Sequence, residues 1–274
     1  MMTNRLQHCD CVEGMNRLPD NFIDLTVTSP PYDDLRTYAP LPMPKFQQVA
    51  EELLRITKPG GVVVWVVQEQ IRDGSQTGTS SEQRLYFRDI GFRLHDRLIM
   101  ARYGLRVPAP HRYGLPVEEA FVLSKGAPAA VTLWKDKPNK HAGKLKTSHR
   151  RLRNGEFEER MQSWVLPRYG RRSNIWRYAT GKFVAKESWV RRAAHGAVMP
   201  EKMAEDLILS YSKPDALVFD PFCGLATTCK MALLNHRRYL GMEISAEFHR
   251  LAVKRMTQAH TEYIVRLHTL LLGA

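Results

Sequence analysis

The stretch that decides the fold is Asp24-Leu25-Thr26-Val27-Thr28-Ser29-Pro30-Pro31-Tyr32. Apolar side chains at Ile23, Leu25 and Val27 predict a short buried strand that leads into a polar tip. Pro30 and Pro31 each have φ fixed near −65° and lack an N–H group, so the tip is rigid and rich in acceptors. Ligands of open α/β sheets bind outside the carboxyl ends of the strands, which makes this tip a candidate active site. The alternative is a plain Pro-Pro turn capped by the aromatic ring.

Strands and helices alternate on both sides of this stretch. In the first half, strands are predicted over 4–8, 22–28, 62–67, 92–102 and 118–125, with helices over 45–57 and 82–90. Toward the end of the chain, helices are predicted over 200–211, 228–234 and 246–270, with strands over 216–219 and 239–244. This alternation is typical of an α/β fold with a doubly wound, Rossmann-like sheet of about seven strands.

Residues 126–192 interrupt the alternation and carry most of the positive charge. The net charge of the chain is +13, and between residues 135 and 192 Lys and Arg outnumber Asp and Glu by 17 to 5. A surplus this concentrated indicates a surface for a polyanion, most often nucleic acid. A solvated basic surface is the alternative. We therefore expect residues 1–125 and 193–274 to form one core domain that carries an inserted basic region.

Several classes of protein are disfavoured by composition. No apolar run reaches the ~18 residues of a membrane helix, so we expect a cytoplasmic protein without membrane contact. The four cysteines, Cys9, Cys11, Cys223 and Cys229, form no C-x-x-C pair, and no histidine spacing matches them. We therefore expect reduced thiols and no metal site.

A second motif follows a predicted strand late in the chain. The sequence Asp220-Pro221-Phe222-Cys223-Gly224 ends that strand, and Thr227-Thr228 opens the next helix. Glycine permits a close approach of the backbone to a ligand, and N–H groups at a helix start attract polar or anionic groups. Glu243 ends the following strand, where an acidic side chain can bind ribose hydroxyls. The loop has too few glycines for a pyrophosphate, which favours a nucleoside ligand.

Together, Thr28-Ser29-Pro30-Pro31-Tyr32 and Asp220-Pro221-Phe222-Cys223-Gly224 resemble the signature motifs of DNA amino-methyltransferases. With the catalytic motif first, the basic region in the middle and the cofactor motif last, the order resembles the permuted β class of that family. The resemblance implies that 1–125 and 193–274 form the catalytic and cofactor-binding domain and that 126–192 recognises the target. It also implies S-adenosyl-L-methionine as the cofactor and double-stranded DNA as the partner.

The resemblance assigns roles to individual residues. The implied catalytic residues are Ser29, Pro30, Pro31 and Tyr32, of which Tyr32 would stack on a flipped base. The implied cofactor-binding residues are Asp10, Cys11, Ala197, Met199, Pro200, Asp220, Phe222, Cys223, Gly224, Thr227, Thr228 and Glu243. In the basic region, the candidate contacts to DNA are Arg150, Arg151, Arg153, Arg171 and Arg172.

The cofactor motif departs from the family pattern at one place. The family loop usually continues Gly-Ser-Gly-Thr-Thr, whereas this chain has Gly224-Leu225-Ala226-Thr227-Thr228. A positive φ at Ala226 would be strained, which predicts weaker cofactor binding or an altered turn. A catalytically weak relative that only binds DNA is therefore one alternative.

The first residue of the catalytic tip bears on the base that is methylated. In this family, Ser before Pro-Pro-Tyr tends to accompany cytosine N4, and Asp tends to accompany adenine N6. Ser29 therefore favours cytosine N4, with adenine N6 as the alternative. Methylation of cytosine carbon 5 needs a nucleophilic Cys. In that family the Cys follows Pro, and the chain contains no Pro-Cys pair. We expect a monomer or homodimer, and any restriction endonuclease partner would be a separate chain.

Overall fold

The computed structural model describes residues 3–31, 45–102, 111, 113–114, 117–179, 185–192 and 198–272. The helices are α1 (Cys11–Asn16), α2 (Phe46–Ile56), α3 (Thr79–Asp89), α5 (Ser188–Arg192), α6 (Glu201–Tyr211), α7 (Thr227–Leu234) and α8 (Ala246–Leu272). The strands of the main sheet are β1 (Arg5–His8), β2 (Ile23–Thr28), β3 (Thr57–Val67), β6 (Arg93–Arg102), β7 (Val117–Ser124), β12 (Ile175–Tyr178), β13 (Leu217–Asp220) and β14 (Arg238–Glu243). The short strands are β4 (Ile71–Arg72), β5 (Ser75–Gln76), β8 (Lys137–Pro138) and β11 (Tyr169–Gly170), and the two longer ones outside the sheet are β9 (Leu145–Arg151) and β10 (Phe157–Val165). Within these ranges, no helix has the length and apolar character needed to cross a membrane.

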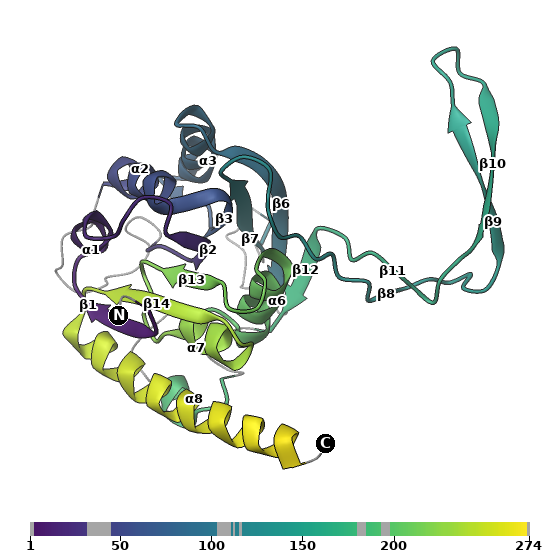
Figure 1. Ribbon diagram of the computed structural model, residues 1–274. Helices are drawn as coiled ribbons and strands as arrows, with labels where there is room; N and C mark the ends of the chain where they lie inside the picture. Colours follow the sequence, from purple (N-terminus) through teal and green to yellow (C-terminus); the bar gives the residue numbers. More distant parts are fainter. Residues whose placement is uncertain are drawn as a thin grey trace. The chain divides into compact units, whose positions relative to one another are not determined.

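Eight strands form one central sheet in the order β1-β14-β13-β2-β3-β7-β6-β12. The first five of these pair in parallel, whereas β7 runs antiparallel to both β3 and β6. β6 and β7 are consecutive along the chain, and consecutive neighbours commonly pair antiparallel. Helices α1, α2 and α3 gather on one side of the sheet and α6, α7 and α8 on the other (Figure 1). The predicted α/β fold with helices on both faces is thus confirmed.

The core of the sheet is made of the apolar runs that identified its strands. Every residue from Val62 to Val67 is buried, as expected for a strand covered on both faces. On one face, Trp65 packs edge-to-face against Phe87, with ring centroids 5.3 Å apart. Each large apolar side chain buried in this way contributes about 1.5–3 kcal/mol. The strand ends that carry the polar motifs are therefore held by a rigid layer.

The chain divides into two compact units, one of residues 1–132 and 175–274 and one of residues 133–174. The basic unit is thus narrower than the 126–192 region expected from the sequence. The difference arises at β12, which pairs in parallel with β6 as the last strand of the main sheet. In β12, Trp176 and Tyr178 are buried, and the hydroxyl of Tyr178 donates to Asp206 Oδ2 at 2.9 Å. Exposed and buried residues alternate over only four residues of β12. An alternation this short does not predict a strand within a basic stretch that contains several Trp residues.

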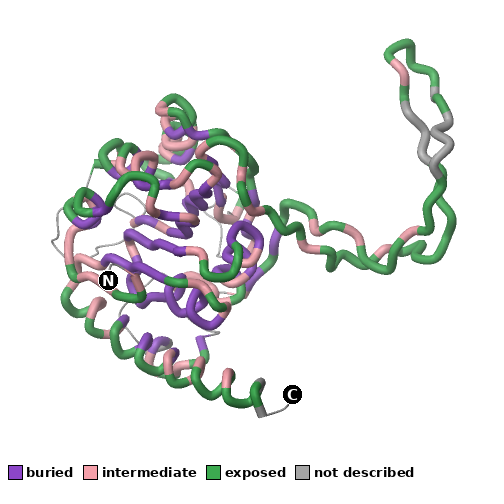
Figure 2. The backbone as a smooth tube through the Cα atoms, viewed as in Figure 1, coloured by how far each residue is buried: buried purple, intermediate pink, exposed green. Residues whose placement is uncertain are grey.

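The basic unit is built around a two-stranded antiparallel ribbon. β9 and β10 pair from Leu145 opposite Val165 to Arg151 opposite Phe157, with an irregularity between Arg160 and Ser163. β8 and β11 form a second, shorter pair. None of the side chains described in this unit is buried (Figure 2). The unit therefore has no apolar core of its own among these residues, and many of its side chains are exposed.

Candidate functional site

Four adjacent strands present polar residues at their carboxyl ends. In sheet order, Asp10 follows β1, Glu243 ends β14, Asp220 ends β13, and Ser29 follows β2. These four strands are parallel neighbours, so their carboxyl ends lie along one edge of the sheet. Residues from positions 10 to 243 are thereby assembled in one row, in the place where α/β sheets bind ligands.

Asp220 connects the loop after β13 to the end of β2 through hydrogen bonds. Its carboxyl group is buried, and Oδ1 accepts hydrogen bonds from Thr28 Oγ1 at 2.7 Å and from the Phe222 N–H at 3.1 Å. The hydroxyl of Thr228 donates to the carbonyl of Val27 at 3.2 Å. Burial raises the pKa of Asp220 to about 6, although the hydrogen bonds from Thr28, Phe222 and Thr228 act in the opposite direction. The Ser29-Pro30 tip and the loop therefore form one connected structure.

Glu243, at the end of the neighbouring strand β14, is hydrogen-bonded to the same loop. Its Oε2 accepts from the Gly224 N–H at 3.0 Å, and its Oε1 accepts from the Ser245 N–H at 2.8 Å. Burial raises the pKa of this carboxyl group above its usual range. Each carboxylate oxygen can accept a further hydrogen bond, so the contacts with the loop leave capacity for a ligand.

The loop contains a residue in a strained conformation, at the position where the sequence departs from the family pattern. Ala226 has φ 59° and ψ 35°, in the left-handed region, and it is the N-cap residue of α7. Gly224 also has a positive φ, of 50°. The Ala226 N–H donates to the Cys223 carbonyl at 2.6 Å, which closes the turn. No side chain caps α7, so the N–H groups of its first turn have no side-chain acceptor at the cap position.

Asp10 and Cys11 lie at the first strand of the row. Asp10 Oδ1 caps α1 by accepting from the N–H groups of Val12 at 2.8 Å and Glu13 at 3.1 Å. Burial raises the pKa of the Cys11 thiol to about 12 and raises those of Cys223 and Cys229 as well. These thiols stay protonated at neutral pH and are unsuited to act as nucleophiles.

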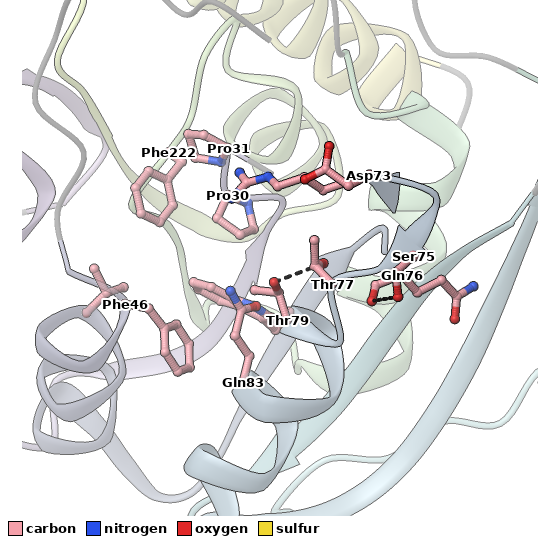
Figure 3. Close-up of a pocket in the computed structure, with 13 residues that line it drawn as sticks. Pro30, Pro31, Phe46, Asp73, Ser75, Gln76, Thr77, Thr79, Gln83 and Phe222 are labelled. Carbon is pink, nitrogen blue, oxygen red and sulfur yellow. Dashed lines mark hydrogen bonds between the residues drawn. The ribbon is translucent and has the colours of Figure 1, made fainter. Parts of the chain in front are cut away.

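A cavity of about 670 Å³ opens beside the tip of β2 (Figure 3). Pro30, Pro31 and Phe222 lie across it from Thr79 and Gln83. Its other lining residues come from α2, β3 and the hairpin of β4 and β5: Phe46, Val49, Trp65, Arg72, Asp73, Ser75, Gln76 and Thr77. The cavity combines an apolar, partly aromatic wall with a polar one, which is typical of a site for a small planar ligand.

The far wall of this cavity was not assigned from the sequence. Trp65 Nε1 donates to Gln83 Oε1 at 2.9 Å, which orients the amide so that its NH₂ group remains a donor. Part of this wall comes from residues 73–81, a stretch rich in Gly, Ser and Thr. Its position after the buried strand that ends at Val67 is the signal that could have placed it at the ligand edge.

The structure also places most of the remaining candidate site residues of the main unit. Met199 and Pro200 directly precede α6, and Pro200 is its N-cap residue. Thr227 and Thr228 are buried in the first turn of α7. Tyr32 and Ala197 lie outside the described residues. In the described ranges, no three His, Cys, Asp or Glu side chains are grouped to hold a metal ion.

The candidate DNA contacts all lie in the basic unit. Arg150 and Arg151 are in β9, and Arg151, Arg153 and Arg171 are exposed. Arg172 is different, because it pairs with Asp136 and lies over the Trp134 ring, 5.2 Å from its centroid. Arg172 thus has a structural role inside the unit, whereas the exposed arginines are open to a partner.

Comparisons with known proteins agree with this geometry. The family model for DNA methylases, the N6/N4 methyltransferases, matches residues 23–254. The chain is 45% identical over 241 residues to the orphan methyltransferase M.BamHII of Bacillus amyloliquefaciens, an alignment that covers 86% of this chain and 89% of that relative.

Solved structures of methyltransferases share the fold. The PvuII DNA methyltransferase, titled cytosine-N4-specific, matches with a TM-score of 0.69 at 17% identity, over 95% of this chain and 92% of that one. TTHA0409 from Thermus thermophilus, solved in complex with S-adenosyl-L-methionine, matches with a TM-score of 0.61 at 20% identity, over 93% of this chain and 95% of that one. Since the family model matches residues 23–254, which include both motifs, this chain belongs to the N6/N4 family of DNA methylases.

Proposed function

We propose that the protein transfers a methyl group from S-adenosyl-L-methionine to the exocyclic N4 amino group of a flipped cytosine in a specific duplex DNA sequence. The observation that carries this proposal is the 2.7 Å hydrogen bond from Thr28 to Asp220. It holds the acceptors of the Ser29-Pro30 tip next to residues 221–226, called here the cofactor loop. The tip and this loop follow adjacent strands of the sheet. Ser29 at the first position of the tip supports cytosine N4 over adenine N6.

The charges at the strand ends fit this cofactor. In the described part of the chain, no Lys or Arg forms an ion pair with Asp220 or Glu243, and burial raises the pKa of both carboxyl groups. A ligand with an ammonium group and ribose hydroxyls would supply the missing positive charge and donors. Asp10 on the adjacent strand end would face the adenine, and Gly224 lets the backbone approach. These residues are the ones we propose to hold the cofactor.

The tip residues act on the amino group of the base. When bound, S-adenosyl-L-methionine supplies a methyl group on a positively charged sulfur. The lone pair of a cytosine amino group is delocalised into the ring, so the group is a poor nucleophile. The Ser29 hydroxyl and the Pro30 carbonyl would each accept a hydrogen bond from this amino group and draw the nitrogen toward sp³ geometry, which frees the lone pair. The rigid prolines keep these acceptors in place before the base arrives.

The cavity beside the tip is the proposed site of the flipped base. Pro30 and Pro31 line it on the side of the cofactor loop, and the Gln83 NH₂ group lies opposite them. Cytosine presents the acceptors N3 and O2 beside its N4 amino group. The Gln83 amide, oriented by Trp65, would donate to one of these acceptors. Tyr32 would stack on the ring.

The basic unit is the proposed DNA-binding surface. Its exposed side chains include Arg151, Arg153 and Arg171, and the antiparallel ribbon of β9 and β10 is narrow enough for a DNA groove. Phosphate contacts from these arginines would position the duplex, while sequence would be read at base edges. Arg150 remains a candidate on the same ribbon.

One labelling experiment tests the proposal. The protein is incubated with methyl-labelled cofactor and duplex DNA, the DNA is digested to nucleosides, and the labelled nucleoside is identified. Label in N4-methylcytosine supports the proposal, and label in N6-methyladenine would assign the alternative base. Retained DNA binding without label would assign a catalytically weak relative. The Ser29→Ala variant serves as the matched low-turnover control.

A further inference from the structure

A cluster of four charged side chains lies behind the cofactor loop, outside the row of strand ends described above. Lys230 Nζ contacts Glu187 at 2.6 Å and Glu201 at 2.7 Å. Arg255 contacts the same two carboxylates, Glu187 through Nε at 3.2 Å and Glu201 through Nη2 at 2.7 Å. The side chains of Lys230 and Arg255 are 2% and 0% exposed. Two positive and two negative groups thus balance each other, with both cationic side chains buried.

Arg255 also reaches the backbone of the loop. Its Nη1 donates to the Leu225 carbonyl at 3.0 Å and to Thr227 Oγ1 at 2.8 Å. These two residues flank Ala226, whose φ is 59°. One guanidinium group, fixed on its other edge by the two carboxylates, therefore holds both neighbours of the strained residue.

The packing of Leu225 adds to this restraint. Its side chain is 2% exposed and packs in a small apolar cluster with Ala185 and Val190. Glu187 comes from the same short segment, which follows β12 in the chain. The segment that returns from the basic unit thus contacts the loop through an apolar side chain and through the charge cluster.

The energetics indicate a role beyond stability. A non-glycine residue in the left-handed region costs about 1–2 kcal/mol and persists only where its surroundings determine it. Buried ion pairs are weak evidence for stability, because the loss of hydration offsets their attraction. The cost of burying two cationic side chains is better explained if the cluster fixes a conformation that the loop sequence itself disfavours.

We propose that Arg255 is a positioning residue that holds the loop at 224–227 in the shape required for cofactor binding, and that it makes the alanine at position 226 tolerable. Glu187, Glu201 and Lys230 fix the guanidinium group in turn. This inference rests on the proposed use of S-adenosyl-L-methionine. It predicts that the need for Arg255 disappears when position 226 becomes glycine, because glycine adopts a positive φ without strain.

The test is a double-mutant cycle on the full chain. The dissociation constant for S-adenosyl-L-methionine is measured by titration calorimetry for the unsubstituted protein, Arg255→Lys, Ala226→Gly and the double variant, with the melting temperature of each. We expect Arg255→Lys to weaken binding about 10-fold, equivalent to ~1.4 kcal/mol. Ala226→Gly alone should stay within about 3-fold of the unsubstituted protein, and the double variant should return to that range.

Two further variants make the result specific. Arg237→Lys is the matched control, because Arg237 is a partly buried arginine that also donates to a backbone carbonyl, that of Ser212, but it precedes β14 at the opposite edge of the sheet. The dissociation constant of the Arg237→Lys variant for S-adenosyl-L-methionine should equal that of the unsubstituted protein. If Arg255→Lys does not fold, Glu187→Gln replaces it, since the amide keeps an acceptor but leaves one excess positive charge. Ala226→Gly should rescue cofactor binding in that background as well.

Three outcomes would overturn the inference. Unchanged affinity in a folded Arg255→Lys protein would remove the positioning role while leaving the proposed function intact. A double variant as weak as Arg255→Lys would show that Arg255 does not act through position 226. Absence of binding by the unsubstituted protein would overturn the proposed function itself, and this inference with it.

Discussion

The hydroxyl of Thr28 donates to the buried carboxyl group of Asp220 across 2.7 Å, which joins two residues that are 192 positions apart in the chain. Thr28 is the last residue of the strand that leads into the Ser29-Pro30 tip, and Asp220 opens the loop toward α7. The relative position of tip and loop is therefore set by a side-chain contact inside the sheet rather than by surface loops. Both residues are buried, so the contact is protected from water.

Removal of this hydrogen bond should destabilise the protein. Thr28→Val keeps the shape of the side chain but leaves Asp220 without one of its donors. We expect the free energy of unfolding, measured by urea denaturation, to fall by about 1–3 kcal/mol. The matched control is Thr26→Val on the same strand, because Thr26 is buried and its Oγ1 has no hydrogen-bond partner in the described structure. That control should be neutral or stabilising, and equal losses for both variants would contradict the role of the contact.

The raised pKa of Asp220 gives stability a pH dependence of definite sign. With a pKa of about 6 when folded and roughly 3.9 when unfolded, the folded protein binds more protons between these values. Its contribution to stability is therefore present below pH 4 and is lost as the pH rises through 6. Relative to Asp220→Asn, which cannot ionise, the free energy of unfolding should fall by roughly 2 kcal/mol from pH 4 to pH 7. A free energy of unfolding that rises with pH relative to that of Asp220→Asn would refute this assignment.

Ser29→Ala should separate chemistry from cofactor binding. Loss of one preorganised acceptor at the reacting amino group is expected to lower kcat about 10²-fold. The dissociation constant of the cofactor should change by less than about 3-fold, because Ser29 is not among the residues proposed to hold it. Calorimetry and a methyl-transfer assay measure the two quantities. Equal losses in both would place Ser29 in the cofactor site instead.

The ribbon arginines should control the salt dependence of DNA binding. If Arg153 neutralises one phosphate, Arg153→Ala should reduce the slope of log affinity against log salt by ~0.9. Arg93→Ala is the control, because Arg93 is exposed at the start of β6, where the strand ends do not form the site. Fluorescence anisotropy with a labelled duplex at several salt concentrations gives both slopes. An unchanged slope for every exposed arginine of the basic unit would exclude that unit as the DNA surface.

Most of the fold was predictable because its strands have strong local signals. Apolar runs such as Val62–Val67 are continuous, and the motif residues directly follow them. Seven of the eight strands in the main sheet lie where the sequence predicted strands. β12 was missed, because burial of Trp176 and Tyr178 depends on pairing with a distant strand and not on a local pattern. The reversed direction of β7 is likewise a property of tertiary pairing.

The site was predictable where a motif follows a strand and unpredictable where a side chain acts from elsewhere. The departure at Ala226 was visible from a comparison of one loop with a family pattern, whereas its positive φ is a finding of the structure. Arg255 was not singled out, because it lies inside a long helix whose basic residues resemble a solvated face. Only the fold shows that its guanidinium group is 0% exposed and meets the loop. Gln83 was missed for the same reason, since its partner Trp65 comes from another element.

Both ends of the basic unit emerge from segments that are anchored in the main unit. Before it, the Thr132 N–H donates to the Ser210 carbonyl at 2.8 Å, and after it β12 is hydrogen-bonded to β6. An insertion bounded in this way can change in length or sequence without disturbing the strand pairings around the candidate site. With the proposed roles of the two units, this architecture would permit modular exchange, in which a new basic segment brings a new target sequence while the main unit stays the same.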